Sequence, residues 1–196
     1  MLRNLLVLLA TSLAIQAWAL HPQEPVDNFH LTDHLGASHA LHDFSDAKAI
    51  VFMVQGNGCP IVRNALPRFR ELRDAYSAQG VAFLMINSNL QDNRISIARE
   101  AQEFSFDVPV WVDESQNVGE RLGLIRTGEV FVVDPKTWSI AYHGAMDDRL
   151  SYENQKAVAD HHYLKDALDD LINGRRVRLS STDAVGCLIY FPDRGR

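Results

Sequence analysis

Cysteine is scarce in this chain, which has two cysteines, Cys59 and Cys187, among its 196 residues. So few cysteines exclude the dense disulfide framework that holds a small secreted scaffold together. The two residues lie far apart in the sequence. They therefore form either one long-range bridge or two independent thiols.

Positive charge and long hydrophobic runs are also in short supply. The formal net charge is −6, which argues against nucleic acid as a partner and against binding to an anionic membrane surface. The apolar stretch at residues 5–15 is too short to span a bilayer stably. There is no internal repeat and no low-complexity segment, and the length suits one domain with a full core.

The first nineteen residues have the pattern of a secretory signal peptide. Arg3 supplies positive charge, the apolar stretch follows, and Ala17-Trp18-Ala19 fits the small-x-small cleavage rule. The alternatives are a buried N-terminal helix or an uncleaved anchor. We expect signal residues 1–19 to be removed and the protein to be periplasmic or secreted, without stable membrane insertion after cleavage. A disulfide can persist in such an oxidising compartment.

The rest of the chain alternates between strand and helix patterns. Apolar segments predict strands at residues 28–31, 48–55, 81–87 and 108–112, and a hairpin at 129–134 and 138–143. Helical spacing predicts helices from Pro60 with a kink at Pro67, around 95–101, and at 115–122 and 164–172. Trp111 and Trp138 lie in predicted strands and are expected in the core.

This order of elements predicts an α/β fold with a mixed central sheet flanked by helices. The domain is expected to cover residues 20–174. Residues 175–196 form a tail without a clear period, and this tail carries Cys187.

Cys59 stands where a predicted strand ends and a helix begins, the place where functional groups gather in such folds. A thiolate there faces free N–H groups and the positive end of the helix dipole, and both lower the pKa of a cysteine. Pro60 suits the first helical turn because its missing N–H costs nothing there. Arg63, one turn further on, adds positive charge. The alternative is that Cys59 is a small buried hydrophobic residue.

The stretch VFMVQGNGCPIVRNALPRFREL, together with GEVFVVD downstream, resembles the thioredoxin-like redoxin (AhpC/TSA) family, and most of all its exported bacterial redoxin-domain proteins. The resemblance covers about residues 26–190. It implies a thioredoxin-like fold and a thiol–disulfide redox protein, with oxidoreductase or antioxidant activity at Cys59 and no cofactor. It also implies a protein disulfide, a small thiol or a peroxide as substrate, and an external reductant.

Three positions depart from the family pattern. Val62 stands where thioredoxins have the second cysteine of Cys-x-x-Cys, so dithiol exchange cannot take place within this motif. Gly56 stands where peroxiredoxins have a hydroxyl that orients peroxide, although Arg126 resembles their distant arginine. After Thr127, Gly128 replaces the cis-proline that faces the cysteine, and we expect a trans peptide bond there.

Cys187 has three possible states. If the tail folds back, Cys187 resolves an oxidised Cys59 or forms a permanent structural bridge with it, and otherwise it stays unpaired. A bridge over so long a loop would stabilise the fold by about 4–5 kcal/mol in the chain-entropy model. The structural bridge alone would make the protein a non-catalytic scaffold.

A metal carrier is the second class of function that the residues allow. Loss of the cis-proline at Gly128 removes a barrier to metal binding at the thiol. Cys59, His143 and Cys187 would then form a soft copper site, because thiolate and imidazole suit copper. This resembles Sco-type copper chaperones in fold and compartment. The remaining histidines show no zinc signature.

Arg149 lies in the segment Met146-Asp147-Asp148-Arg149, which follows the predicted hairpin. It either approaches the thiol face and stabilises a thiolate, or forms a salt bridge within a solvated turn.

Overall fold

A computed structural model describes residues 25–192 of the chain, so the predicted signal peptide lies outside the described residues. The strands are β1 (His30–Asp33), β2 (Ser38–Ala40), β3 (Ala49–Val54), β4 (Val81–Asn87), β5 (Val110–Val112), β6 (Val130–Asp134) and β7 (Ser139–Gly144). The helices are α1 (Pro60–Tyr76), α2 (Arg94–Glu103), α3 (Asn117–Leu122) and α4 (Tyr163–Ile172). Short 3₁₀ helices occupy Leu41–Phe44 and Ser77–Gln79.

All seven strands form one mixed sheet in the order β2-β1-β5-β4-β3-β6-β7. The central strand β3 runs parallel to β4 and antiparallel to β6, with Phe52 opposite Leu84 and Phe131. Every residue of β3 is buried, as expected for a central strand that is covered on both faces. The expected α/β fold with a mixed, helix-flanked sheet is confirmed.

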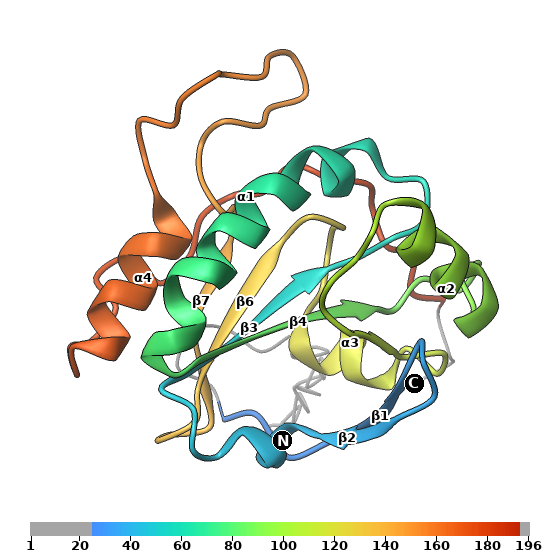
Figure 1. The fold of residues 1–196 in the computed structure, drawn as a ribbon, viewed down its shortest axis with the longest axis horizontal. Helices are drawn as coiled ribbons and strands as arrows, with labels where there is room; N and C mark the ends of the chain where they lie inside the picture. The colour runs from blue at the N-terminus through green and yellow to red at the C-terminus, as the bar shows by residue number, and fades with distance from the viewer. Residues whose placement is uncertain (1–24, 193–196) are drawn as a thin grey trace, which may run out of the picture.

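The two faces of the sheet carry separate hydrophobic clusters. Residues of α1, α2 and α4, such as Phe69, Ile97 and Leu168, pack with Cys59 on one face. The opposite face contains Trp111 and is covered by α3 and the segment before β1. Figure 1 shows α1 lying alongside α4 across the sheet. Cys59 therefore lies at the edge of the first cluster, beneath the start of α1.

The tryptophans show where the sequence-based prediction was right and where it was wrong. Trp111 lies in β5 and is fully buried, as expected. Trp138 lies in the turn between β6 and β7 with a φ of +48°, not in a strand. It is only partly buried, and its ring packs against the His42 ring at 3.8 Å between centroids. Helix α1 continues through Pro67.

Segments near both ends of the described chain form β-bridges with β7, the last strand in the sheet order. Residues Pro25 and Ser139 form an antiparallel bridge, and Ser181 forms a parallel bridge with His143. From there the tail returns past β7 to the start of α1, as Figure 1 shows. Its residue Leu188 then forms an antiparallel bridge with Arg126, in the loop before β6. The tail thus joins two distant parts of the sheet.

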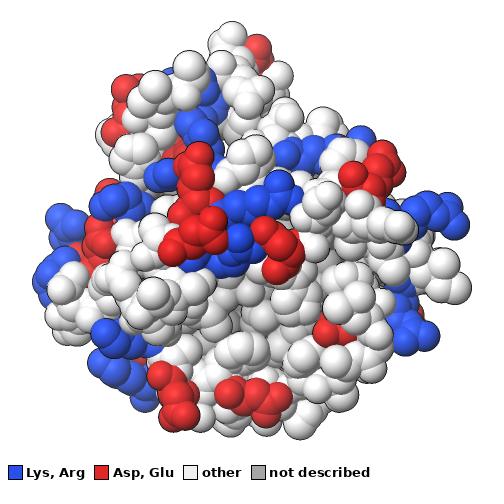
Figure 2. Space-filling model, in the orientation of Figure 1, with Lys and Arg blue, Asp and Glu red and all other residues white. Residues whose placement is uncertain are grey.

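Charged side chains of both signs are interspersed on the face shown in Figure 2. On α1 they form ion pairs such as Arg68–Glu71 and Arg73–Asp107, and such exposed pairs add little stability. Within residues 25–192, no helix has both the length and the apolar character needed to cross a membrane.

Candidate redox site

Cys59 occupies the N-cap of α1, directly after the turn that ends β3. Its N–H donates to Gly56 O at 3.2 Å, and its carbonyl accepts from the Arg63 N–H at 3.2 Å. Pro60 takes the first helical position, as expected, where no N–H is needed. The Cys59 residue is only 2% exposed. The strand–turn–helix sequence therefore places this thiol at the helix start but beneath the surface.

Buried polar side chains hold the turn before Cys59. The Asn57 N–H donates to Asp92 Oδ2 at 3.0 Å, and the Asn57 side-chain amide donates to Ser96 Oγ at 2.9 Å. The Gly58 N–H donates to Glu100 Oε1 at 3.1 Å. These bonds satisfy backbone groups that the turn leaves without a partner. Sequence reasoning missed this set, because its members lie on α2 and the loop before it.

Thr127 supplies a hydroxyl at the thiol. Its Oγ1 donates a hydrogen bond to Cys59 Sγ at 3.0 Å, and the residue is buried. A Cβ on residue 56 would lie 2.5 Å from Thr127 Cγ2. Gly56 stands where peroxiredoxins have a hydroxyl residue. Because glycine has no side chain, Thr127 can occupy the space next to it and place its own hydroxyl at the thiol.

Gly128 has a φ of +84°, and a Cβ there would lie 2.9 Å from Ile61 Cγ2. Proline is locked near a φ of about −65°, so this backbone conformation excludes a proline at residue 128. No cis peptide bond occurs within the described residues, and the expected trans bond before Gly128 is confirmed. The Gly128 N–H donates to Val54 O at 2.7 Å, which ties the loop to β3.

The tail places Cys187 directly against Cys59. Cys187 donates its thiol hydrogen to Cys59 Sγ at 3.2 Å, and both cysteines are free thiols in this structure. The Cys187 N–H donates to Thr127 Oγ1 at 3.1 Å, and the Thr127 N–H donates to Cys187 O at 2.9 Å. A Cβ on Gly186 would lie 1.7 Å from Thr127 O, so only glycine allows this close approach.

The two thiols differ in exposure and in acidity. Cys187 is exposed, whereas Cys59 is buried. Burial raises the pKa of Cys59, but hydrogen bonds from Thr127, the Val62 N–H and Cys187 outweigh burial and hold the pKa below that of an ordinary cysteine. Burial and the hydrogen bond to Cys59 raise the pKa of Cys187. Cys59 is therefore the more acidic thiol of the pair.

Three arginines were expected to support the thiol, and the structure gives each a different partner. Arg63 binds the buried Glu100 through two nitrogens and lies over the Phe104 ring. Its charge is thus directed to Glu100, and the hydrogen bonds to Cys59 Sγ come from other groups. Arg149 pairs with Asp147 at 2.9 Å, within a turn.

The third arginine, Arg126, contacts the tail. Its Nη1 donates to Tyr152 Oη at 2.9 Å and to Gly186 O at 3.4 Å. Sequence reasoning missed Tyr152, because it lies in a loop without periodicity and far from both cysteines in the sequence.

The copper site considered from the sequence is not assembled. His143 lies on β7, and its ring stacks on the Phe131 ring. Phe131 belongs to the hydrophobic cluster on one face of the sheet, whereas Cys59 belongs to the cluster on the opposite face. Among residues 25–192, no three His, Cys, Asp or Glu side chains are grouped so that they could hold a metal ion. His143 therefore does not join Cys59 and Cys187.

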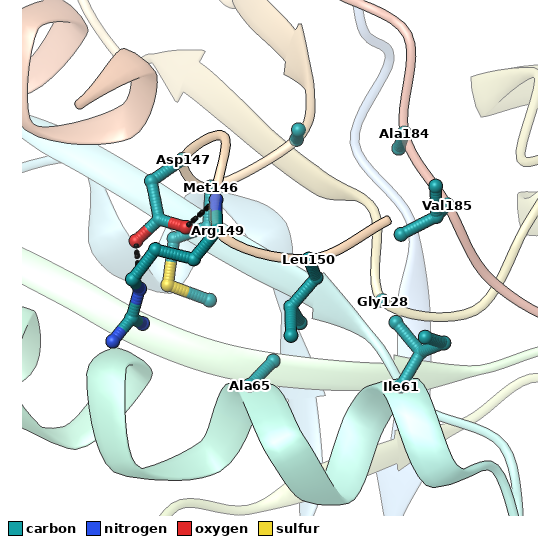
Figure 3. A pocket seen from close by; sticks show the side chains of 10 residues that line it. Ile61, Ala65, Gly128, Met146, Asp147, Arg149, Leu150, Ala184 and Val185 are labelled. Carbon is teal, nitrogen blue, oxygen red and sulfur yellow. Dashed lines mark hydrogen bonds and ion pairs between the residues drawn. The ribbon is translucent and has the colours of Figure 1, made fainter. Parts of the chain in front are cut away.

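A small pocket opens between α1, the loop after β7 and the tail (Figure 3). Ile61 and Ala65 point into it from α1, and Leu150 and Val185 lie opposite them. Arg149, paired with Asp147, lies at one end. The pocket therefore has an apolar floor and a charged end, and neither cysteine lines it.

The AhpC/TSA family profile matches residues 22–146. The chain belongs to the AhpC/TSA family. An uncharacterized conserved protein from Geobacillus kaustophilus is 28% identical, with a TM-score of 0.76, over 88% of this chain and 93% of that protein. A hypothetical protein from Sinorhizobium meliloti 1021 is 25% identical, with a TM-score of 0.74, over 91% of this chain and 97% of that protein.

A more distant structure shows the fold alone. The peroxidoxin BcpB from Mycobacterium tuberculosis is 19% identical, with a TM-score of 0.59, over 79% of this chain and 97% of that protein. The expected thioredoxin-like fold is confirmed, and so is membership of the redoxin family. No functionally curated protein matches the sequence.

Proposed function

We propose that this protein is an exported thiol–disulfide redox protein that cycles between a Cys59–Cys187 dithiol and an intramolecular disulfide. The 3.2 Å between the two sulfurs carries the proposal. A disulfide bond is about 2.05 Å long, so a small movement of Cys187 closes it. Export rests on the signal pattern of residues 1–19, and an oxidising compartment supplies partners for such a cycle.

From the exposure of the two cysteines we infer the reverse of the order in which we expected them to act. Cys59 was expected to attack an outside disulfide and Cys187 to resolve the product. Cys187 is the sulfur that a partner can reach, whereas Cys59 lies beneath the tail. Cys59, with its lowered pKa, is also the better leaving group. We therefore assign the outward-facing role to Cys187 and the internal role to Cys59.

Reduction of the disulfide proceeds in two exchanges. An outside thiolate attacks Cys187 Sγ, a mixed disulfide forms between them, and the Cys59–Cys187 bond breaks with Cys59 leaving as thiolate. A second outside thiolate then attacks the partner sulfur of the mixed disulfide and releases Cys187, which takes up a proton. The two electrons come from the outside thiols, which become a disulfide. Oxidation follows the same steps in reverse.

Glutathione buffers of varied ratio test this cycle on the mature protein, with free thiols counted by alkylation and mass spectrometry. We expect two thiols in reducing buffer and none in oxidising buffer, with one intramolecular bridge. Cys59→Ser should form a mixed disulfide with glutathione at Cys187, and Cys187→Ser should react at Cys59 roughly tenfold more slowly, because that thiol is buried. Two free thiols in every buffer would refute the cycle, and equal rates would refute the assigned order.

Peroxide reduction is a second candidate, favoured by the Thr127 hydroxyl at Cys59 Sγ. A peroxide would transfer one oxygen to the Cys59 thiolate, giving a sulfenic acid and an alcohol or water. The Cys187 thiol would then form the disulfide and release water. Stopped-flow oxidation by hydrogen peroxide and by glutathione disulfide distinguishes the two candidates. Peroxidase function predicts the faster reaction with peroxide, and its loss in Thr127→Val.

A further inference from the structure

The Tyr152 hydroxyl holds both polar groups of Gly186, the residue before Cys187. It donates to Gly186 O at 2.9 Å and accepts from the Gly186 N–H at 3.1 Å. Tyr152 lies in the long loop between β7 and α4, and its residue is 66% exposed. An exposed tyrosine that binds two backbone groups fixes both the position and the rotation of that residue.

Arg126 contacts both the Tyr152 hydroxyl and Gly186. Its guanidinium donates to the same Tyr152 hydroxyl at 2.9 Å and to Gly186 O at 3.4 Å, and it lies 6.0 Å from the Tyr152 ring centroid. The hydroxyl thus accepts two hydrogen bonds and donates one, which is its full capacity. Arg126 is itself fixed, because its backbone N–H donates to the buried Glu129 at 3.0 Å.

We propose that Tyr152 and Arg126 are positioning residues that pin the Gly186 peptide and so hold Cys187 against Cys59. This inference rests on the proposed dithiol cycle and adds to it the residues that set its equilibrium. Within the described residues, neither side chain forms a hydrogen bond with either sulfur. Both act through the backbone next to Cys187, and we call the two side chains together the Gly186 clamp.

The clamp acts on an exposed part of the tail, just before the buried Ile189 side chain joins the core. Cys187 and Leu188 are exposed, so burial of side chains contributes little to this part of the tail. Other hydrogen bonds at residues 187–189 come from the Thr127 and Ile189 N–H groups, join Cys187 to the Thr127 hydroxyl and link the two thiols. Without the clamp, the reduced tail detaches more often, and closing the disulfide then costs more entropy.

The clamp and the disulfide therefore stabilise each other. By thermodynamic reciprocity, whatever the clamp adds to disulfide stability, the disulfide adds to clamp stability. The clamp also covers Cys59, because the tail that it holds shields that buried sulfur. One change at Tyr152 should thus alter both the redox equilibrium and the accessibility of Cys59.

Tyr152→Phe tests the inference, with Tyr190→Phe as the matched control. Tyr190 lies in the same tail, is 71% exposed, and no hydrogen bond of its hydroxyl is found within the described residues. Equilibration of each mature protein with glutathione buffers gives the equilibrium constant of the Cys59–Cys187 disulfide. We expect Tyr152→Phe to lower this constant roughly fivefold, the effect of about one net hydrogen bond, and Tyr190→Phe to leave it unchanged.

A second measurement separates the clamp from the cycle. In the Cys187→Ser background, the rate at which iodoacetamide modifies Cys59 reports how often the tail opens. Adding Tyr152→Phe should raise that rate roughly fivefold at unchanged circular dichroism. The clamp is overturned if Cys187→Ser is alkylated at the same rate with and without Tyr152→Phe. It is also overturned if Tyr190→Phe, added to Cys187→Ser, raises the rate equally. Failure of wild type to form the disulfide overturns the cycle instead, and the alkylation rates still report the clamp.

Arg126→Met closes a double-mutant cycle with Tyr152→Phe. If the two side chains form one clamp, the double variant should alkylate no faster than the faster single variant. Fully multiplied effects would show two independent contacts and would remove Arg126 from the proposal.

Discussion

The two cysteines sit in regions that are held in opposite ways. Cys59 follows β3, and its turn is fixed by hydrogen bonds from the Asn57 and Gly58 N–H groups to the buried Asp92 and Glu100 side chains. Cys187 lies on an exposed tail that a few hydrogen bonds attach to the loop before β6. The difference suggests that changes near Cys59 alter the stability of the whole domain. Changes near Cys187 should alter only the position of the tail and the accessibility of Cys59.

The strongest test of this contrast is Gly186→Ala. A Cβ there would lie 1.7 Å from Thr127 O, and this backbone cannot yield without moving the loop. We expect the tail to detach near Cys187, iodoacetamide to modify Cys59 roughly a hundredfold faster, and the midpoint of urea unfolding to change little. Leu188→Ala, at an exposed neighbouring position, is the control and should match wild type. Unfolding of the domain in Gly186→Ala would contradict the contrast.

Gly128→Ala addresses the loop that the tail rests on. The φ of +84° and the contact with Ile61 Cγ2 at 2.9 Å should together cost about 2 kcal/mol of unfolding free energy. Gly174→Ala is the matched control, since it has a φ of +67° and no atom within 4 Å of the added Cβ. Its cost of about 1 kcal/mol measures the backbone conformation alone. Equal costs in urea unfolding would show that the Ile61 contact contributes nothing.

Thr127→Val acts on both regions at once. It removes the hydroxyl that binds Cys59 Sγ and the Cys187 N–H, at nearly constant volume. We expect about 1–1.5 kcal/mol of lost stability and a higher pKa of Cys59. The pH dependence of Cys59 alkylation, measured in the Cys187→Ser background, reports that pKa. An unchanged profile would exclude the hydroxyl as a cause of the lowered pKa.

The lowered pKa also gives a pH dependence of stability. The folded chain loses the Cys59 proton at lower pH than the unfolded chain, whose thiol titrates at its ordinary value of 9.0. The free energy of unfolding of the reduced protein should therefore rise with pH as the folded Cys59 ionises, up to about pH 9. This gain is lost as the pH falls through the folded pKa, and Thr127→Val should flatten the rise.

The smallest effect is expected for Ser96→Ala, which removes three hydrogen bonds: one from the Asn57 side chain, one from the Asn93 N–H and one donated to Asn93 O at the start of α2. We expect a loss of about 1 kcal/mol in urea unfolding and no change in Cys59 alkylation. Faster alkylation of Cys59 would show that the turn, and not the tail, governs access to the sulfur.

The sequence predicted the fold well because apolar periodicity specifies buried strands and helices directly. It placed β3, α1 and β4 within a residue or two and Cys59 at the start of α1. Trp138 was misplaced, because the β-hairpin pattern does not reveal that a turn residue adopts a positive φ.

The candidate site was predictable only in its local part. The position of Cys187 depends on contacts between the tail and residues 125–127, and no periodic pattern encodes such contacts. Tyr152 and the Asn57 set were missed for the same reason, since long-range polar partners leave no spacing in the sequence. One feature of the sequence pointed to this contact. Gly186 precedes Cys187, and a glycine allows the backbone to approach another segment closely.

Both terminal segments of the described chain also lie against β7, one of the two outer strands of the sheet. An outer strand offers unpaired backbone groups to another copy of the same protein, and natural sheets cover such strands to avoid association. Pro25 at one end of β7 and Ser181 near the other reduce the length that is left open. Truncation of the N-terminal segment through Pro25, which leaves Cys187 in place, should therefore cause aggregation at high concentration before any loss of redox chemistry.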